Sequence, residues 1–390
     1  MTDKYPGARR AAILVTCAVV LQAAEAYLPR VPVPGIRLGL ANVITLIAII
    51  EFGFWGALEV AAIRTVAASL LLGTFLSPSF LISFVSAVSS AVVMAGMYEL
   101  IKKMKNPFLS LTGISIIGAG AHNAAQLFTV YFVLIRNDAV FMLAPWLGLS
   151  AVITGFITGV IASQICGAGK KVKPALGVIK KDKRGIKAVN TASGWKFAPV
   201  YLITCAVVFA VCVFIFENMF FYPLAFAGVI LASVFGGLSL KNTFLVLYRA
   251  KYLLIFSFLV PVFFTAGGAA LFEAGPVKIT AVGLKEGMYF FSRIALLMMS
   301  SSALCAALGP KKLAEGMRDF LRPFELLGFN AGRFSAILVS SWVNFPAFWE
   351  KAGISAKKQG DMVKAGKKGL IVAAGLVIAE IIMTAEENFI

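Results

Sequence analysis

The chain has 390 residues, of which 60% are hydrophobic and only 14% are charged, and its mean hydropathy is +0.90. Soluble domains are about 45–50% apolar and about 25% charged, so this composition excludes an ordinary soluble protein and indicates an integral membrane protein. The formal net charge is +18, and the basic residues cluster between apolar runs, where they report membrane orientation rather than nucleic-acid binding.

The first part of the chain predicts membrane-spanning helices, because its apolar runs approach the length of about 20 residues that a span needs. These segments lie near residues 11–29, 38–51, 54–76, 80–101, 110–135 and 141–166. Proline, glycine and asparagine mark the breaks between them. The first run is interpreted as a retained helix and not as a signal peptide, since Gln22, Glu25 and Tyr27 interrupt its end.

A basic stretch, "KKVKPALGVIKKDKRGIK" (170–187), holds eight Lys or Arg and one Asp. Basic loops favour the cytoplasmic side of a membrane. Arg9 with Arg10, and the "KKMK" stretch at 102–105, fit the same side, because an even number of predicted helices separates each landmark from the next. We therefore expect a first domain at 1–168, a cytoplasmic linker at 169–196 and a second domain at 197–390. The protein is expected in a bacterial-type cytoplasmic membrane, with its N-terminus on the cytoplasmic side.

The second domain begins with predicted apolar segments near 198–216, 218–238, 242–266 and 287–308. The loop at 266–287 is expected to be external. Beyond it, apolar side chains recur at helical spacing among basic ones, which is typical of an interfacial amphipathic helix; its expected apolar face is Leu313, Met317, Phe320 and Leu321. A last apolar stretch is Gly369–Met383. The predicted fold class is all-α and polytopic.

The sequence offers no pattern for catalysis. Its five cysteines form no CxxC pair, so neither a metal site nor a disulfide framework is indicated. The five aspartates are not paired as a magnesium-diphosphate site requires, and there is no Walker A motif. One histidine alone supports no catalytic triad. We therefore predict a non-enzyme with no catalytic residue, no metal and no cofactor.

Polar and ionisable side chains inside the predicted spans are costly and mark candidate sites. In the first domain they are Glu25, Arg37, Asn42, Arg64, His122, Asn123 and Gln126. One interpretation is a pocket for a small polar or anionic solute, in which all of these except Glu25 bind the solute. The other is that these groups only hydrogen-bond neighbouring helices. In the second domain, Arg249, Lys251 and Arg293 are expected to snorkel toward headgroups.

The stretches "PVPGIRLGLANVITLIAI", "GTFLSPSF" and "GAGAHNAAQL" together resemble the Gx transporter family, also described as heptaprenyl diphosphate synthase component I. The resemblance covers about residues 11–166. That family is similar to the solute-binding S components of energy-coupling factor vitamin transporters, which implies six helices and a solute pocket near the external side.

The stretch "FLRPFELLGFNAGRFSAILVSSWVNFPAFWEKA" resembles the T component, the coupling subunit of the same transporters, over about residues 197–390. That resemblance implies cationic helix tips that dock on cytoplasmic ABC-type ATPase subunits. The basic candidates for such contacts are Arg318, Arg322, Arg333, Lys357 and Lys358. The sequence departs from the family pattern, because "SAKKQG" and "TAEENFI" stand where each coupling helix should end in Ala-Arg-Gly.

Three functions remain open on the sequence. The first is transport of a small solute, such as a vitamin, a flavin or a quinone- or isoprenoid-related precursor, with a separate ATPase as partner. The second is a membrane scaffold or assembly subunit of a redox system. The third is an accessory component of prenyl diphosphate synthesis. The expected partners are a small solute, the lipid bilayer and an ATPase pair, and not nucleic acid.

Overall fold

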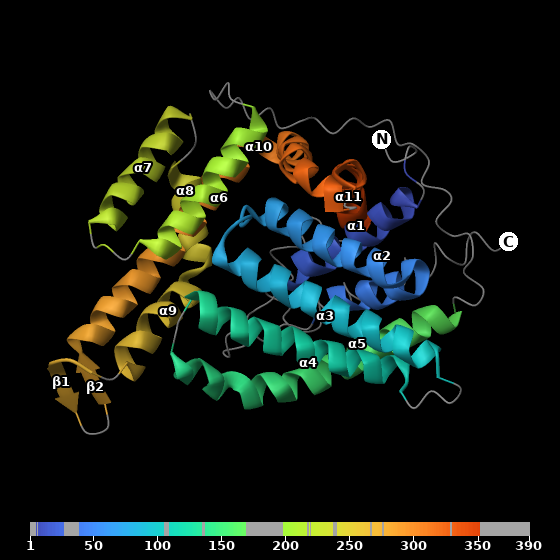
Figure 1. Cartoon of the computed structure of the whole chain (residues 1–390), viewed down its shortest axis with the longest axis horizontal. Helices are drawn as coiled ribbons and strands as arrows, with labels where there is room; N and C mark the ends of the chain where they lie inside the picture. Colours follow the sequence, from blue (N-terminus) through green and yellow to red (C-terminus); the bar gives the residue numbers. More distant parts are fainter. Residues whose placement is uncertain are drawn as a thin grey trace.

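A computed structural model of the chain describes residues 5, 7–26, 39–104, 109–134, 137–168, 198–216, 218, 220–236, 240–265, 267–274, 277–327 and 330–351. Its elements are almost all helices, which confirms the predicted fold class (Figure 1). The first half, up to Ala168, consists of α1 (Ala8–Ala26), α2 (Ala41–Leu72), α3 (Pro78–Lys102), α4 (Leu111–Thr129), the π-helical turn η2 (Val130–Leu134), the 3-10 helix η3 (Asp138–Leu143) and α5 (Ala144–Ala168).

The second half starts at Pro199. It consists of α6 (Pro199–Ile215), α7 (Phe221–Phe235), α8 (Leu240–Arg249), α9 (Lys251–Phe264), β1 (Ala270–Ala274), β2 (Val277–Thr280), α10 (Ala281–Leu321), the 3-10 helix η5 (Arg322–Leu327) and α11 (Ala331–Lys351). The predicted segment at 242–266 is divided at Ala250, whose backbone leaves the helical region between α8 and α9. The final apolar stretch, Gly369–Met383, lies outside the described residues.

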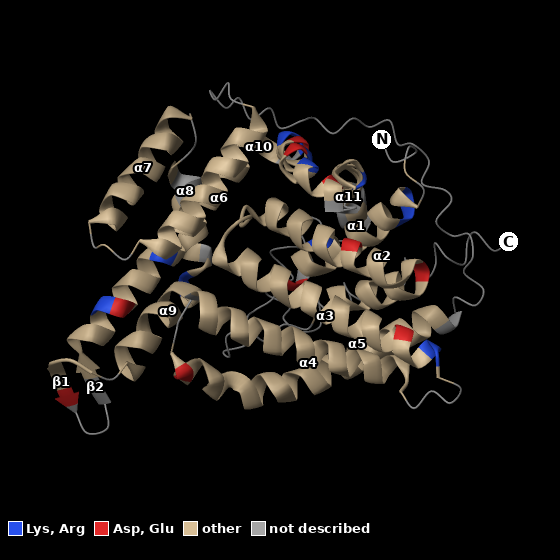
Figure 2. Cartoon of the chain, viewed as in Figure 1, with Lys and Arg blue, Asp and Glu red and all other residues tan. Residues whose placement is uncertain are grey.

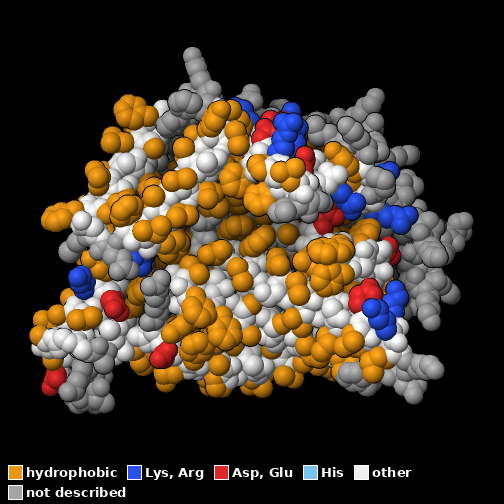
Figure 3. Space-filling model, in the orientation of Figure 1, with side chains coloured by type: hydrophobic (Ala, Val, Ile, Leu, Met, Phe, Trp, Pro, Cys, Tyr) orange, Lys and Arg blue, Asp and Glu red, His pale blue; other side chains and the backbone are white. Residues whose placement is uncertain are grey.

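Several helices are long and apolar enough to cross a membrane. In the described part of the chain, the segments with the length and composition of a span are Pro78–Lys102, Asp138–Cys166, Ala281–Gly309 and Ala41–Leu72, the last of which is interrupted at Gly53. Lys, Arg, Asp and Glu residues are sparse along the helices (Figure 2). Hydrophobic side chains are spread over the face shown in Figure 3, where charged side chains form only a few small groups. The protein is therefore a multi-pass membrane protein.

Helix α2 is a hairpin of two limbs and not one straight helix. Gly53, with φ 69° and ψ −163°, interrupts it, and glycine enters that left-handed region without the penalty that a Cβ imposes. The Arg64 Nη2 donates to Asn42 Oδ1 at 3.0 Å, although 22 positions separate the two residues. In a straight helix they would lie about 33 Å apart. The chain therefore reverses at Gly53, and the two limbs correspond to the predicted segments 38–51 and 54–76.

Helix α10 bends at Gly309, which also has a positive φ, of 65°. The segment after the bend is the helix predicted to lie in the membrane interface. Its side chains Leu313 and Met317 are buried. A Cβ at Gly316 would lie 2.9 Å from Pro199 Cβ, which places this segment against α6. The part of the apolar face formed by Leu313 and Met317 is therefore covered by protein, whereas Phe320 and Leu321 are half-buried.

Helix α1 belongs to the first half by sequence, but it packs against both α2 and α11. Ala8, Ala12 and Thr16 follow one another at intervals of four, so they share one helix face, and all three are fully buried or nearly so. The Thr16 hydroxyl donates to its own helix at Ala12 O (2.7 Å) and to Ser341 O of α11 at 3.3 Å. Small side chains let helix backbones approach closely in membranes, so α1 joins the two halves.

The loop predicted at 266–287 is partly regular. Strands β1 and β2 form an antiparallel pair, and α10 already begins at Ala281 (Figure 1). Near the base of this hairpin, Asn137 Nδ2 of the first half lies 3.3 Å from Thr265 Oγ1, which in turn bonds Glu286 Oε2 at 3.2 Å. The two halves are therefore joined at this end as well as along α1.

A pair of glycines holds α5 against α4. A Cβ at Gly155 would lie 2.6 Å from Ile116 Cα, and a Cβ at Gly159 would lie 2.6 Å from Thr112 Cα. Because the obstructing atoms belong to the backbone, a side chain there can be accommodated only if the helices separate. The G-x-x-x-G spacing is one that brings membrane helices into close contact.

We expect Gly155→Ala to destabilise the protein by about 1–3 kcal/mol, because it overpacks this contact. The measurement is thermal unfolding of the full chain in detergent. Gly148→Ala on the same helix is the matched control, since a Cβ at Gly148 meets no atom within 4 Å among the described residues. Equal melting temperatures for the two variants would contradict the close packing of α4 on α5.

Candidate functional site

A buried polar cluster lies between α1 and the two limbs of α2. Asn42 stands in the first turn of α2 and Arg64 stands in its second limb, and the reversal at Gly53 brings them into hydrogen-bond contact. Both side chains are almost completely buried, with exposures of 7% and 4%. Two of the predicted solute-binding residues are thus in direct contact, inside a core that is otherwise apolar.

Glu25 completes this cluster from the last turn of α1. Its Oε1 accepts a hydrogen bond from the backbone N–H of Leu40, just before α2 begins, and its carboxylate interacts electrostatically with Arg64. A buried guanidinium needs such compensation, since an isolated charge is expensive to place in a low-dielectric core. The cluster Glu25–Asn42–Arg64 can therefore hold charge within the membrane. Arg37, the other predicted cation of this region, lies outside the described residues.

The predicted solute-binding residues of α4 are not part of this cluster. Asn123 Nδ2 donates to Leu147 O at 2.8 Å and to Ser150 Oγ at 3.1 Å, both on α5. These hydrogen bonds between α4 and α5 are of the kind that the alternative interpretation predicts. His122 and Gln126 are half-buried, lie one turn apart, and each takes part in further interactions. For Asn123 the hydrogen bonds account for the side chain without a solute.

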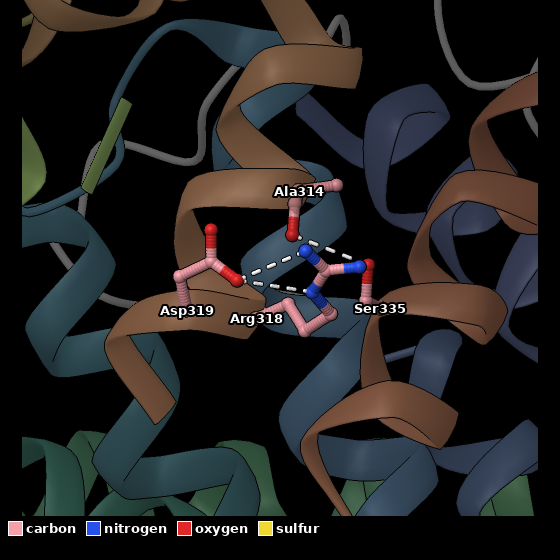
Figure 4. A network of polar contacts seen from close by, with 4 residues as sticks. All are labelled: Ala314, Arg318, Asp319 and Ser335. Atoms are coloured by element: carbon pink, nitrogen blue, oxygen red, sulfur yellow. Dashed lines mark hydrogen bonds and ion pairs between the residues drawn. The ribbon is translucent and has the colours of Figure 1, made fainter. Parts of the chain in front are cut away.

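The predicted partner-binding arginines are spread over three environments. Arg318 is exposed, and its Nε and Nη2 both donate to Asp319 Oδ1, at 3.1 and 3.0 Å (Figure 4). Arg322 is exposed at the start of η5. Arg333 instead forms a 2.9 Å ion pair with Glu59 of α2, in which both side chains are mostly buried. Lys357 and Lys358 lie outside the described residues.

Helix α11 is held against the end of α10 close to these arginines. The Ser335 hydroxyl donates to Ala314 O at 3.2 Å, as Figure 4 shows beside Arg318. Asn330 caps the start of α11 by accepting from Arg333 N at 2.8 Å. The side chain of Arg333 is therefore fixed at the junction of the two halves, whereas Arg318 and Arg322 face outward.

Sequence reasoning missed Glu59 as a functional candidate. The signal was present, because a carboxylate inside a predicted apolar segment is itself unusual. Arg293 was expected to snorkel, but it is buried, and its Nε donates to Tyr222 Oη at 3.0 Å. Its guanidinium thus reaches a partner on α7 instead of the headgroups. Among the described residues, no group of three His, Cys, Asp or Glu side chains could hold a metal ion.

These features define a multi-pass helical membrane protein with a buried charged cluster in its first half and an ion pair at the junction of its halves. Residues 14–165 match the family model of heptaprenyl diphosphate synthase component I. The chain is also similar to curated relatives named energy-coupling factor transporter transmembrane protein EcfT. Both resemblances inferred from the sequence are confirmed by these matches.

The similarity to these relatives is partial. The protein from Listeria innocua is 29% identical over 161 residues, which are 40% of this chain and 59% of the relative. The protein from Thermosediminibacter oceani is 27% identical over 158 residues, which are 40% of this chain and 58% of the relative. The chain thus spans 58–59% of the length of these two curated relatives. By their names, the relatives are transmembrane proteins of energy-coupling factor transporters.

Proposed function

We propose that the chain is a two-part membrane transporter for a small polar solute. In this proposal the first half binds the solute and the second half couples it to a separate cytoplasmic ATPase pair, as in an energy-coupling factor system. The observation that carries the proposal is the buried cluster Glu25–Asn42–Arg64. Ionisable groups are retained inside membrane bundles chiefly where they serve a solute or ion path. The similarity to transporter components supports the same function.

The coupling surface in this proposal is the outward side of the turn between α10 and α11. Arg318 and Arg322 are exposed there, and so is Leu326, with 93% of its surface accessible. Arginine suits a contact with carboxylates of a partner because its planar fork binds both oxygens. Lys357 and Lys358 remain candidates for the same contact. Arg333 is mostly buried in its ion pair with Glu59 and is therefore the weakest candidate of this set.

The membrane orientation is part of the proposal. We place the N-terminus, the linker and the α10–α11 turn on the cytoplasmic side. Two close approaches support one common side for these segments. Gly332, at the start of α11, lies so near Tyr5 that an added Cβ would meet the Tyr5 hydroxyl. Gly316, near the end of α10, likewise lies so near Pro199, just after the linker, that an added Cβ would meet it. Basic loops favour that side of the membrane.

The test of the proposal is solute uptake and export by cells with and without the gene, using a panel of labelled vitamins, flavins and quinone precursors. We expect the movement of one class to depend on the gene and to be lost with Asn42→Leu, which removes the acceptor of Arg64. Arg318→Gln serves as a second variant and should reduce transport without reducing solute binding. Unchanged movement of the whole panel on deletion of the gene would overturn the proposal.

A second candidate function is a membrane scaffold that does not transport. The observation in its favour is the continuous packing of the two halves, because one hydrophobic core contains Leu21 and Ile63 of the first half together with Leu313 and Ile337 of the second. A shared core resists the relative motion that transport requires. Gentle purification discriminates the two, since ATPase subunits in stoichiometric amounts support transport and redox subunits support the scaffold.

A further inference from the structure

The bundle core beside the charged cluster contains polar atoms with nothing to bond. Among the described residues, Gln22 Oε1, Thr45 Oγ1 and Arg64 Nε are buried and have no hydrogen-bond partner. Thr45 is fully buried, and Arg64 is 4% exposed. Buried polar atoms are nearly always partnered, and each exception needs an explanation. All three atoms lie on the helices that build the Glu25–Asn42–Arg64 cluster.

The helical register places Gln22 and Thr45 one turn from members of the cluster that Arg64 contacts. Gln22 precedes Glu25 by three residues on α1, and Thr45 follows Asn42 by three residues on α2, so each shares a helix face with a member of the cluster. Helix α1 runs toward the cluster and the first limb of α2 runs away from it, since Glu25, in the last turn of α1, accepts a hydrogen bond from Leu40, just before α2 begins. Gln22 and Thr45 therefore lie at the same depth, one turn inward from Glu25 and Asn42.

The unpartnered donors and acceptors of Gln22, Thr45 and Arg64 define a complementary ligand group. Arg64 Nε offers an N–H, Gln22 Oε1 accepts, and the Thr45 hydroxyl does either. A ligand must therefore present an acceptor beside a donor. Because Glu25 offsets the charge of Arg64, the described side chains of the cluster carry no excess positive charge. A diphosphate or other polyanion would be poorly compensated there.

We propose that this level of the bundle, formed by Gln22, Thr45 and Arg64, binds an uncharged solute through a carboxamide or cyclic imide edge. Such an edge places a carbonyl oxygen next to an N–H in the same direction, which matches the guanidinium donor and the amide acceptor. The proposal rests on the proposed transport function and narrows its substrate class. It assigns to Gln22 and Thr45 a role that neither the family match nor the relatives provide.

The test is thermal unfolding of the full purified chain in detergent with defined probes. Riboflavin, uracil and nicotinamide carry uncharged imide or carboxamide edges, whereas 3-methylriboflavin and 1,3-dimethyluracil have the imide N–H blocked. Inorganic diphosphate serves as the polyanionic probe. We expect at least one of the first three to raise the melting temperature. Neither of the two blocked analogues nor diphosphate should raise it at the same concentration.

Two near-isosteric variants separate binding from stability. Thr45→Val and Gln22→Met remove the atoms that have no partner, so the empty protein should unfold at the same or a higher temperature. The same variants should weaken binding of the effective probe about tenfold, which is the usual consequence of one lost hydrogen bond of about 1.4 kcal/mol.

Thr65→Val is the matched control, because the Thr65 hydroxyl is satisfied by Ala62 O at 2.8 Å within its own helix. It should leave probe binding unchanged. Absence of a shift with every amide or imide probe overturns the inference, as does a shift by diphosphate that depends on Thr45. If Thr45→Val leaves the transport of a solute intact, the inference fails while the proposed transport function stands.

Discussion

Arg64→Met is expected to destabilise the protein by about 3–5 kcal/mol, because it removes a buried guanidinium and leaves the half-buried Glu25 carboxylate without the cation that it interacts with. The substitution also removes the donor to Asn42 Oδ1. Thermal unfolding in detergent measures the effect. The double variant with Glu25→Gln should recover much of the lost stability, since it removes the stranded charge.

The double variant tests whether Arg64 and Glu25 are energetically coupled. If Arg64 and Glu25 act as a unit, the effects of the two single substitutions will not add. Simple addition would show that the two side chains are energetically independent and that the cluster is not a charge pair. Thr65→Val, at the position next to Arg64, measures the loss of stability that an ordinary substitution at a buried position of α2 causes.

The second large effect is expected at the junction of the halves. Glu59→Gln and Arg333→Met each break the 2.9 Å ion pair between α2 and α11, and each should cost about 1–3 kcal/mol, because hydrogen bonds to charged groups in partly buried sites are among the stronger ones. Thermal unfolding again measures the cost. The reversed pair, Glu59→Arg with Arg333→Glu, should restore part of the stability.

Arg318→Met is the control for this junction. Arg318 pairs with its neighbour Asp319 on an exposed surface, and surface pairs contribute little, so its melting temperature should stay close to that of the unchanged chain. If Arg333→Met is equally silent, the ion pair does not hold the halves together. If Arg333→Met lowers the melting temperature, any motion between the halves has to break the Glu59–Arg333 ion pair.

Much of the fold was predictable because hydrophobic length is a strong signal in a membrane protein. The segment near 80–101 corresponds to α3, and the one near 198–216 corresponds to α6. The segment near 242–266 was wrong as a single helix, because nothing in its apolar composition marks the break at Ala250. The strand pair at 270–280 was also missed, since a short hairpin leaves little signal in so small a window.

The candidate site was predictable only in part. Arg64 and Asn42 were found because a charge or an amide inside an apolar run is unusual by itself. Glu25 was recognised as an intramembrane polar residue but not as their partner, since pairing depends on how α1 meets α2. Arg333 was selected for its charge, yet its ion pair with Glu59 depends on a contact across more than 270 positions of sequence, which composition cannot reveal.

The sequence by itself determined the membrane class, the helical fold and the identity of the costly polar residues, because each follows from local hydrophobicity and from the free energy of burying charge. Only the tertiary structure decided that α2 reverses at Gly53, that α1 lies between the halves, and which polar groups meet. Those outcomes depend on helix packing, in which small residues and single backbone angles decide how surfaces with similar hydrophobicity fit together.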